Sequence, residues 1–249
     1  MREEVEIMKK FWNLKKTQNN IGELYLYSEI ADTTWWGDET TPKQFKEELD
    51  SLGDIDTLNV YINSPGGDVF AGITIYNMLK RHPATKNVYI DGLAASIASV
   101  IAMAGDSIIM PKNAMMMIHK AWGVCIGNAN DMRKFADDLE KIEESIVESY
   151  MTKASISEDE IKSMMDAETW LSAEECYGYG LCTEVVEEKK MAACISDKFM
   201  KNYKNVPKQL VEPPQKEEAE QVEEINNFEV ERLRLELAMT DSFLLQEKN

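Results

Sequence analysis

Short apolar runs alternate with helix-like segments along the first three quarters of the chain. Apolar runs bounded by glycine, proline or polar residues predict buried strands at 21–30, 58–62, 87–90, 107–110 and 114–118. Apolar residues spaced by three or four predict helices over 69–81, 96–104 and 128–153, and Thr41 with Pro42 marks a further helix start. Repeated strand–helix alternation predicts an α/β fold of βαβ units with a largely parallel sheet.

Small-residue segments separate some of these strands from the helices that follow. Residues 63–68 (NSPGGD) predict a tight turn, and residues 92–95 (GLAA) predict a second one. Ser157 with Glu160, and Ser172 with Glu175, have the spacing of capping boxes and predict two more helix starts.

Composition divides the chain into four parts. Residues 1–20 are charged and predict a loosely structured arm, and residues 21–186 carry the folded core. Prolines mark a linker over 187–215, whose exposed character makes self-cleavage there a hypothesis. Residues 216–249 form an acidic tail with near-heptad apolar spacing, which fits either a helical or a solvated, partly disordered segment.

Charge and apolar content exclude several classes of function. The net charge of −18 leaves no basic surplus to meet phosphates, so we expect no nucleic-acid partner. The longest apolar run, 93–104, is too short to cross a bilayer, and the charged start does not resemble a signal peptide. We therefore expect a soluble, cytoplasmic protein without a membrane partner. The four cysteines form no CxxC pair, so we expect no metal site.

Only two histidines are available for catalysis. His82 follows a predicted helix and suits a structural place at its end. His119 follows an apolar strand, where a structural or a catalytic role is open. Ser96 opens a predicted helix after the small-residue turn, and it either caps that helix or presents a nucleophile beside free N–H groups. Ser99, one turn later, is expected to be buried and inert.

The turn at 63–68 admits two interpretations. A glycine-rich turn can cradle phosphate, but no lysine follows and Asp68 would repel an anion. A neutral carbonyl substrate suits it better, and a tight turn without a functional role stays open.

Three motifs together resemble the Clp protease proteolytic subunit family, ClpP. They are residues 61–67 (YINSPGG), 92–99 (GLAASIAS) and 116–119 (MMIH), in the order that the family shows, and the likeness covers about 21–186. The resemblance implies that Ser96 is the nucleophile and His119 the general base. It also implies an oxyanion hole from the N–H groups of Gly67 and Ile97, and substrate pairing along Gly66, Gly67 and Asp68.

The acid of the triad is less well defined. The family has an aspartate shortly before an aromatic-Leu-Ser-Ala segment, and matching by position places Glu168 there. Asp166 is the alternative acid, and a Ser–His dyad remains open.

Two segments resemble the phage-encoded branch of the family, the head maturation (prohead) proteases: residues 32–38 (DTTWWGD) and 168–172 (ETWLS). That branch implies capsid or scaffold proteins as substrates, cleaved inside a procapsid in the host cytoplasm. The family further implies a crotonase-like fold, a homo-oligomeric ring and a long handle helix, for which 132–150 is the candidate. No cofactor is implied, and no ATP-binding motif is present.

Three alternatives remain. The chain could be a housekeeping-type ClpP that works with a partner ATPase. It could be a crotonase-fold enzyme for acyl-CoA thioesters, which needs no Ser–His pair. It could also be a catalytically inactive assembly or scaffold protein that keeps the fold.

Overall fold

An eight-stranded sheet is the framework of the protein. The computed structural model describes residues 11–17, 19–31, 42–187 and 203–207, all within the compact unit Met1–Pro207. The strands are β1 (Trp12–Lys16), β2 (Ile21–Leu26), β3 (Thr57–Ser64), β4 (Thr85–Ala95), β5 (Ser107–Pro111), β6 (Met115–Ile118), β7 (Thr169–Ser172) and β8 (Glu184–Val186). The helices are α1 (Pro42–Ser51), α2 (Val69–Arg81), α3 (Ile97–Ala102), α4 (Ala129–Met151), α5 (Glu158–Asp166) and α6 (Ala173–Gly178).

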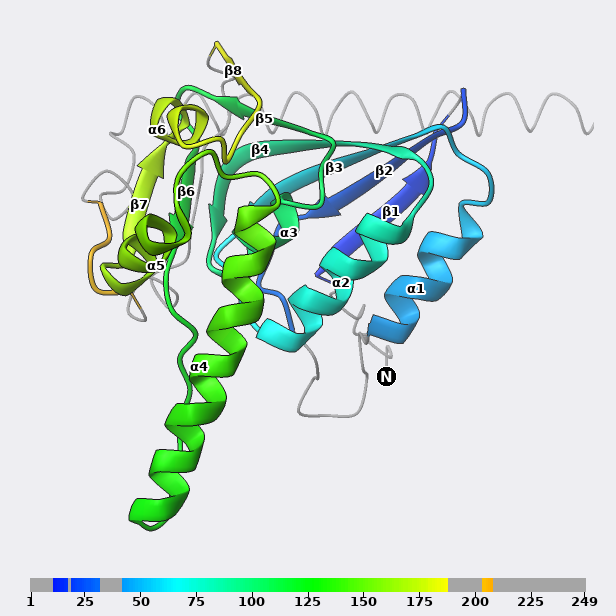
Figure 1. Ribbon diagram of the computed structural model, residues 1–249. Helices are drawn as coiled ribbons and strands as arrows, with labels where there is room; N and C mark the ends of the chain where they lie inside the picture. The colour runs from blue at the N-terminus through cyan, green and yellow to red at the C-terminus, as the bar shows by residue number, and fades with distance from the viewer. Residues whose placement is uncertain (1–10, 18, 32–41, 188–202, 208–249) are drawn as a thin grey trace, which may run out of the picture. The chain divides into compact units, whose positions relative to one another are not determined.

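The sheet is mixed but mainly parallel. Its strand order is β1-β2-β3-β4-β5-β8, and β6 pairs with the far end of β4 and with β7. Only β1 with β2 and β6 with β7 are antiparallel among the described strand pairs. The predicted α/β fold of crossover units is therefore confirmed, and Figure 1 shows α1, α2 and α3 on one face of the sheet.

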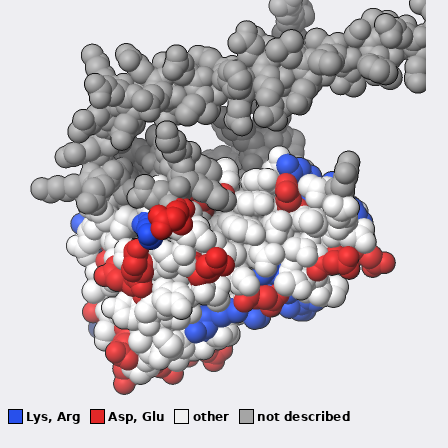
Figure 2. All heavy atoms as spheres, turned by 90° about the horizontal axis from the view of Figure 1, so that it is seen from above, with Lys and Arg blue, Asp and Glu red and all other residues white. Residues whose placement is uncertain are grey.

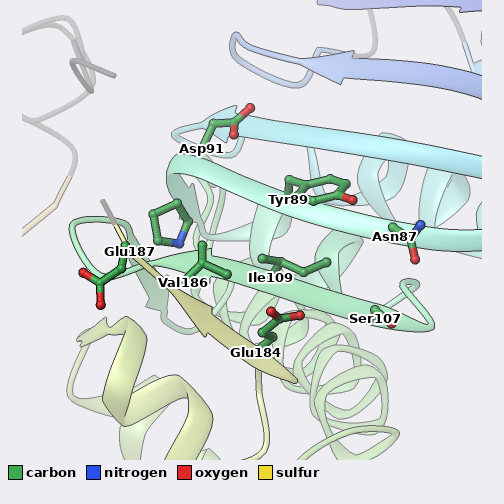
Figure 3. A pocket seen from close by; sticks show the side chains of 9 residues that line it. Asn87, Tyr89, Asp91, Ser107, Ile109, Glu184, Val186 and Glu187 are labelled. Atoms are coloured by element: carbon green, nitrogen blue, oxygen red, sulfur yellow. The ribbon is translucent and has the colours of Figure 1, made fainter. Parts of the chain in front are cut away.

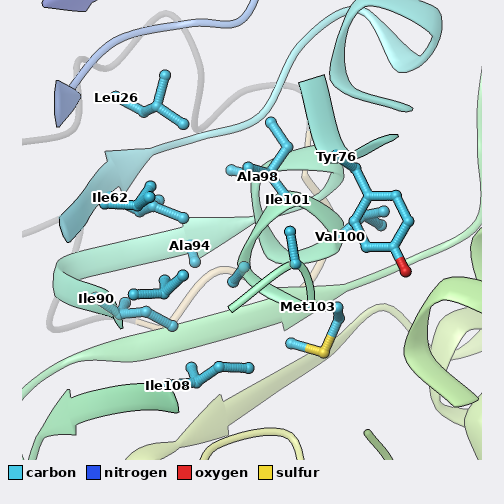
Figure 4. Close-up of a cluster of buried hydrophobic side chains, with 14 of the residues drawn as sticks. Leu26, Ile62, Tyr76, Ile90, Ala94, Ala98, Val100, Ile101, Met103 and Ile108 are labelled. Carbon is cyan, nitrogen blue, oxygen red and sulfur yellow. The ribbon is translucent and has the colours of Figure 1, made fainter. Parts of the chain in front are cut away.

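The main core lies between this face and the helices. Along β3, buried and half-buried residues alternate strictly, as expected for a strand with one face against helices. Figure 4 shows Leu26, Ile62 and Ile90 on the sheet side, with residues of α3 opposite them. All six residues of α3 are buried, and all of them except Ser99 are apolar, as expected for a helix without a solvent-facing side.

Two local predictions were wrong. The predicted loose arm 1–20 contains β1, because Trp12 is buried against Phe45 while polar residues occupy the other face of an edge strand. The predicted turn at 92–95 is instead the end of β4. Leu93, Ala94 and Ala95 are fully buried there, since small side chains fit where β6 pairs alongside.

Helix starts were predicted more accurately than strand ends. Helix α2 has the predicted bounds, and α4 begins after Asn128, whose side chain takes part in a capping box. The capping boxes at Ser157 and Ser172 are confirmed. The acidic tail 216–249, most of the linker and residues 32–38 lie outside the described residues.

Acidic side chains gather in several groups on the face of the protein drawn in Figure 2, with basic side chains between them and along one edge. Among the described helices, none has the length and apolar content that crossing a membrane requires.

Candidate active site

Strand register brings the predicted residues to one edge of the sheet. In the parallel pair β4–β6, Ala95 lies opposite Met117, so Ser96 and His119 leave the sheet at neighbouring positions. In the antiparallel pair β6–β7, Ile118 lies opposite Thr169, which places Glu168 across from His119. Because carboxyl ends of parallel strands share an edge, this is where an α/β sheet holds its ligand.

Ser96 occupies a sharp turn between β4 and α3. Its φ of 56° and ψ of −130° are unusual for a residue with a side chain. Its backbone N–H donates to the carbonyl of Met117 over 2.9 Å, which fixes the turn. The hydroxyl makes no capping bond to α3, so the interpretation of Ser96 as a mere helix cap is wrong.

The hydroxyl of Ser96 instead contacts His119. Ser96 Oγ and His119 Nε2 are 2.7 Å apart, a hydrogen-bond distance. Burial lowers the pKa of His119, and the negative charge of Glu168 partly offsets that effect by raising it. The imidazole is therefore mainly neutral near pH 7, the form that can accept a proton from a hydroxyl.

The glycine turn at 65–68 lies directly beside Ser96. A Cβ on Gly66 would come within 2.6 Å of the Ser96 Cβ, and Gly66 has a φ of +99°. A Cβ on Gly67 would overlap the backbone of Ile30, at a φ of +146°. Only glycine therefore permits this close approach of three backbone segments.

Part of this turn is already paired within the chain. Gly66 accepts a hydrogen bond from the Ile30 N–H, and the Asp68 N–H donates to the Ile30 carbonyl. The Asp68 side chain caps α2 at Ala71. Ile30 and Gly67 thus form a parallel bridge, in which the N–H and C=O groups of Gly67 point away from Ile30. A substrate strand could pair with these two groups, but not with Gly66 O or the Asp68 N–H, which Ile30 already occupies.

The two candidate acids have different surroundings. Asp166 is exposed and forms an ion pair with Lys120 over 2.8 Å, which lowers the pKa of the carboxyl. The negative charge of Glu168 raises the pKa of His119. The backbone of Glu168 has a φ of 50°, in the left-handed region. Among the described residues, the partners of the Glu168 carboxylate are the N–H groups of Lys204 and Asn205, each at 2.7 Å, and not His119.

A small apolar cavity of about 10 Å³ adjoins the Ser–His pair. Its lining comes from α2, α3, α4 and the segment after β6: Val69, Ser96, Ile97, Val100, His119, Ala121, Ile146 and Tyr150. Tyr150 is buried and shares a hydrogen bond of 2.7 Å with Ser99, which is also buried as predicted. This cavity can take an apolar side chain only after some displacement of its walls.

A larger pocket of about 590 Å³ lies elsewhere, over β4, β5 and β8. Figure 3 shows Tyr89 and Ile109 along its sheet wall, with Asp91, Glu184 and Glu187 around it. Neither Ser96 nor His119 lines this pocket, so its size does not make it the catalytic site.

Tyr203 is a site residue that the sequence did not indicate. Its ring meets those of His119 and Trp170 edge to face, at 5.5 and 5.9 Å between centroids. It lies in a stretch predicted as linker, and no periodicity or motif marks it. His82, in contrast, ends α2 as expected and accepts a hydrogen bond from the Ala84 N–H.

Comparisons with known proteins agree with this geometry. A family model described as Clp protease matches residues 38–189. The ATP-dependent Clp protease proteolytic subunit of Deinococcus radiodurans is 30% identical over 145 residues, 57% of this chain and 71% of that protein. Its counterpart from Bacteroides fragilis is 31% identical over 144 residues, 57% and 69% of the two chains. A solved variant of ClpP1 from Listeria monocytogenes superposes with a TM-score of 0.58 and 26% identity, covering 67% of this chain and 92% of that one.

Proposed function

The chain belongs to the Clp protease family, a family of serine peptidases, and from this premise we propose that it is an active endopeptidase with Ser96 as nucleophile and His119 as general base. The observation that carries the proposal is the 2.7 Å contact between Ser96 Oγ and His119 Nε2, at a turn where the serine hydroxyl does not serve as a helix cap. Nucleophile and base within hydrogen-bond reach are the minimum that acyl transfer requires.

The chemistry follows the general logic of a Ser–His pair. Ser96 Oγ attacks the carbonyl carbon of the substrate while its proton passes to His119 Nε2. His119 then gives this proton to the leaving amine, and the C–N bond breaks. Water hydrolyses the acyl-enzyme by the same route in reverse, which regenerates the free serine.

In this proposal, two backbone N–H groups stabilise the developing oxyanion. The Gly67 N–H faces away from Ile30, toward the side where a substrate would lie. The Ile97 N–H belongs to the first residue of α3 and so has no acceptor within the helix. Donors fixed in advance in this way supply a large share of catalysis in acyl transfer.

Glu168 is the better supported acid. Its charge acts on the pKa of His119, whereas Asp166 is paired with Lys120. A carboxylate across from the base stabilises the imidazolium that forms during attack. We assign this role to Glu168 in the substrate-bound enzyme, with Asp166 as the alternative that mutation tests.

The test is reaction with a fluorophosphonate probe, read by peptide mass spectrometry on the full chain. We expect the label on Ser96, no label in Ser96→Ala, and strongly reduced labelling in His119→Ala. Glu168→Ala should lose more labelling than Asp166→Ala. An assembled, folded chain in which no variant is labelled would instead favour the inactive scaffold alternative.

The finer proposal is processing of capsid or scaffold proteins without ATP. The sequence likeness of residues 32–38 and 168–172 to the phage-encoded branch supports it. The names of the relatives, ATP-dependent proteolytic subunits, favour the alternative of a partner ATPase.

These two functions differ in what they need to cleave a protein. A head maturation protease should cut a capsid or scaffold protein encoded beside it, with the purified chain alone and without nucleotide. A subunit that depends on an ATPase should cleave short peptides alone, but proteins only when an ATPase and ATP are added. Incubation of the purified chain with such a capsid protein, followed by mass spectrometry, separates them.

A further inference from the structure

Residues 203–207 lie against the catalytic edge of the sheet, although they follow β8 by many positions in the sequence. The segment (orange in Figure 1) runs beside β7 and α5. Two groups of contacts hold it, one through the Tyr203 side chain and one through the backbone of Lys204 and Asn205.

Tyr203 fills a slot formed by the proposed base His119 and by residues close to the catalytic groups. Its hydroxyl donates to the carbonyl of Pro65, the residue before Gly66 and Gly67. Its ring packs edge to face on His119 and Trp170, and against the apolar cluster of Leu93, Ala95 and Met117. Burial and the charges of Glu168 and Glu29 raise the pKa of Tyr203 to about 12, and the neighbouring Ser96 hydroxyl lowers this pKa slightly. The Tyr203 hydroxyl therefore keeps its proton near pH 7 and can donate a hydrogen bond.

The backbone after Tyr203 binds the candidate acid. The Glu168 carboxylate accepts the N–H groups of Lys204 and Asn205 through one oxygen, at 2.7 Å each. Asn205 Nδ2 also donates to the carbonyl of Ala167 over 2.8 Å. Hydrogen bonds to a carboxylate are stronger than neutral ones, so these contacts compete for the group that would otherwise serve His119.

One donor in the slot is left over. The Trp170 indole N–H is buried and has no hydrogen-bond partner among the described residues. A buried donor without an acceptor disfavours the packed state. The tyrosine ring therefore fits the slot but leaves the Trp170 N–H without an acceptor among the described residues. This weakens the binding of Tyr203, as expected for an occupant that a substrate can displace.

We propose that Pro65, His119 and Trp170 form a subsite for an aromatic residue of a peptide, and that the chain's own Tyr203 occupies it. This inference rests on the proposed function, since it assigns a substrate side chain to the same site. With Tyr203 in place, a peptide cannot lie across Ser96 at this position, and Glu168 is held by the segment. Residues 203–207 are thus a tethered competitor of substrate.

The first experiment measures docking without reference to catalysis. Hydrogen exchange is followed by mass spectrometry in full-length Ser96→Ala and in Ser96→Ala with Tyr203→Ala. We expect the amides of Lys204 and Asn205 to exchange about tenfold or more slowly in the first chain, and close to the rate of an unstructured peptide in the second. Unprotected amides in both chains would overturn the proposal.

The second experiment measures competition at Ser96. The rate of fluorophosphonate labelling should rise about fivefold or more in full-length Tyr203→Ala, because the site is open for a larger share of the time. Tyr203→Phe keeps the ring but loses the hydroxyl, with its bond to Pro65 and its interaction with Ser96, and should lie between this variant and the wild type. Tyr177→Ala is the matched control, since Tyr177 is exposed on α6 and should label at the wild-type rate.

A peptide added in trans tests the chemistry of the slot. The heptapeptide of residues 201–207, KNYKNVP, should slow the labelling of Tyr203→Ala, and the same peptide with alanine for tyrosine should not. Equal labelling of wild type and Tyr203→Ala, or equal effects of the two peptides, would refute the aromatic subsite. If no variant is labelled, the proposed function fails, and protected amides would still support the docking of Tyr203.

Discussion

The imidazole of His119 is subject to two opposing influences on its pKa. Burial disfavours the imidazolium, and the Glu168 charge favours it, with burial the larger effect. The other groups that contact the ring, the Ser96 hydroxyl and the neutral Tyr203 ring, carry no charge near pH 7. The protonation state of the base is therefore set by how deeply it is buried and by one carboxylate.

This balance predicts the pH dependence of Ser96 labelling. Neutral His119 is the active form, so the rate should rise with pH through a midpoint below the usual histidine value of about 6.5. Glu168→Gln removes the charge that raises the pKa, so the midpoint should move lower by about one unit or less. The plateau rate should also fall, by about tenfold or more, because the imidazolium loses its stabilising charge.

Asp166→Asn is the matched control for that experiment. Asp166 lies on the neighbouring element and pairs with Lys120, so its loss should leave the midpoint unchanged. A midpoint that moves upward in Glu168→Gln, or that moves equally in both variants, would contradict the assignment of Glu168.

The backbone of Gly67 allows a separate prediction, about the free energy of unfolding. A Cβ there would overlap the Ile30 backbone at a positive φ, so Gly67→Ala should lower the free energy of unfolding by about 2–4 kcal/mol. Gly53 also has a positive φ, but nothing lies within 4 Å of its would-be Cβ. Gly53→Ala should therefore cost only about 1–2 kcal/mol, the strain of the backbone alone. Urea denaturation of the two variants measures the difference.

At the level of elements, periodicity and capping in the sequence predicted most helices and the parallel sheet. They missed β1, β7 and β8, which are three to five residues long. β7 and β8 pair with β6 and β5, which are distant in the sequence, whereas β1 forms a hairpin with β2 but is mostly polar and so gives no apolar run. The motifs located Ser96 and His119, because each follows directly on a strand end. The place of Tyr203 could not be predicted, since it depends on a tertiary contact of a segment without a pattern of its own.

Two helices meet at the oxyanion side of the site, and this contact can be tested. Gly72 lies in the middle of α2, where alanine would normally favour the helix. A Cβ at this position would overlap the side chain of Ile97, the first residue of α3. Gly72→Ala should therefore lower stability by about 1–3 kcal/mol and slow Ser96 labelling, because the Ile97 N–H moves with its side chain.

The control for this variant is another glycine at a helix. Nothing lies within 4 Å of a Cβ on Gly178, the last residue of α6. Gly178→Ala should leave labelling unchanged and stability equal or slightly higher. Thermal unfolding and the rate of Ser96 labelling, measured on both variants, would show the contrast. If Gly72→Ala is labelled at the wild-type rate, the displacement of the Ile97 side chain does not move the Ile97 N–H at the site.

At the scale of the whole molecule, α4 and the segment leading into it expose apolar side chains. In Figure 1 this helix extends away from the sheet, and the chain after β6 runs alongside it. Large apolar side chains are exposed there: Trp122 at 59%, Val124 at 79%, Ile126 at 94% and Met132 at 52%. A group of exposed apolar residues on one projecting element is typical of a protein interface.

The family resemblance implies rings that stack in pairs through a handle helix, and we therefore predict that this surface joins copies of the chain. Ile126→Asp together with Trp122→Asp should place charges in an apolar contact and separate the stacked rings, so that the mass in sedimentation velocity falls to about half. Tyr177→Asp, at a similarly exposed residue on α6, should leave the mass unchanged. If the double variant assembles like the wild type, the rings do not meet through α4. If the wild type is itself a monomer, the exposed residues serve another partner, because a surface of this kind is costly to leave in water.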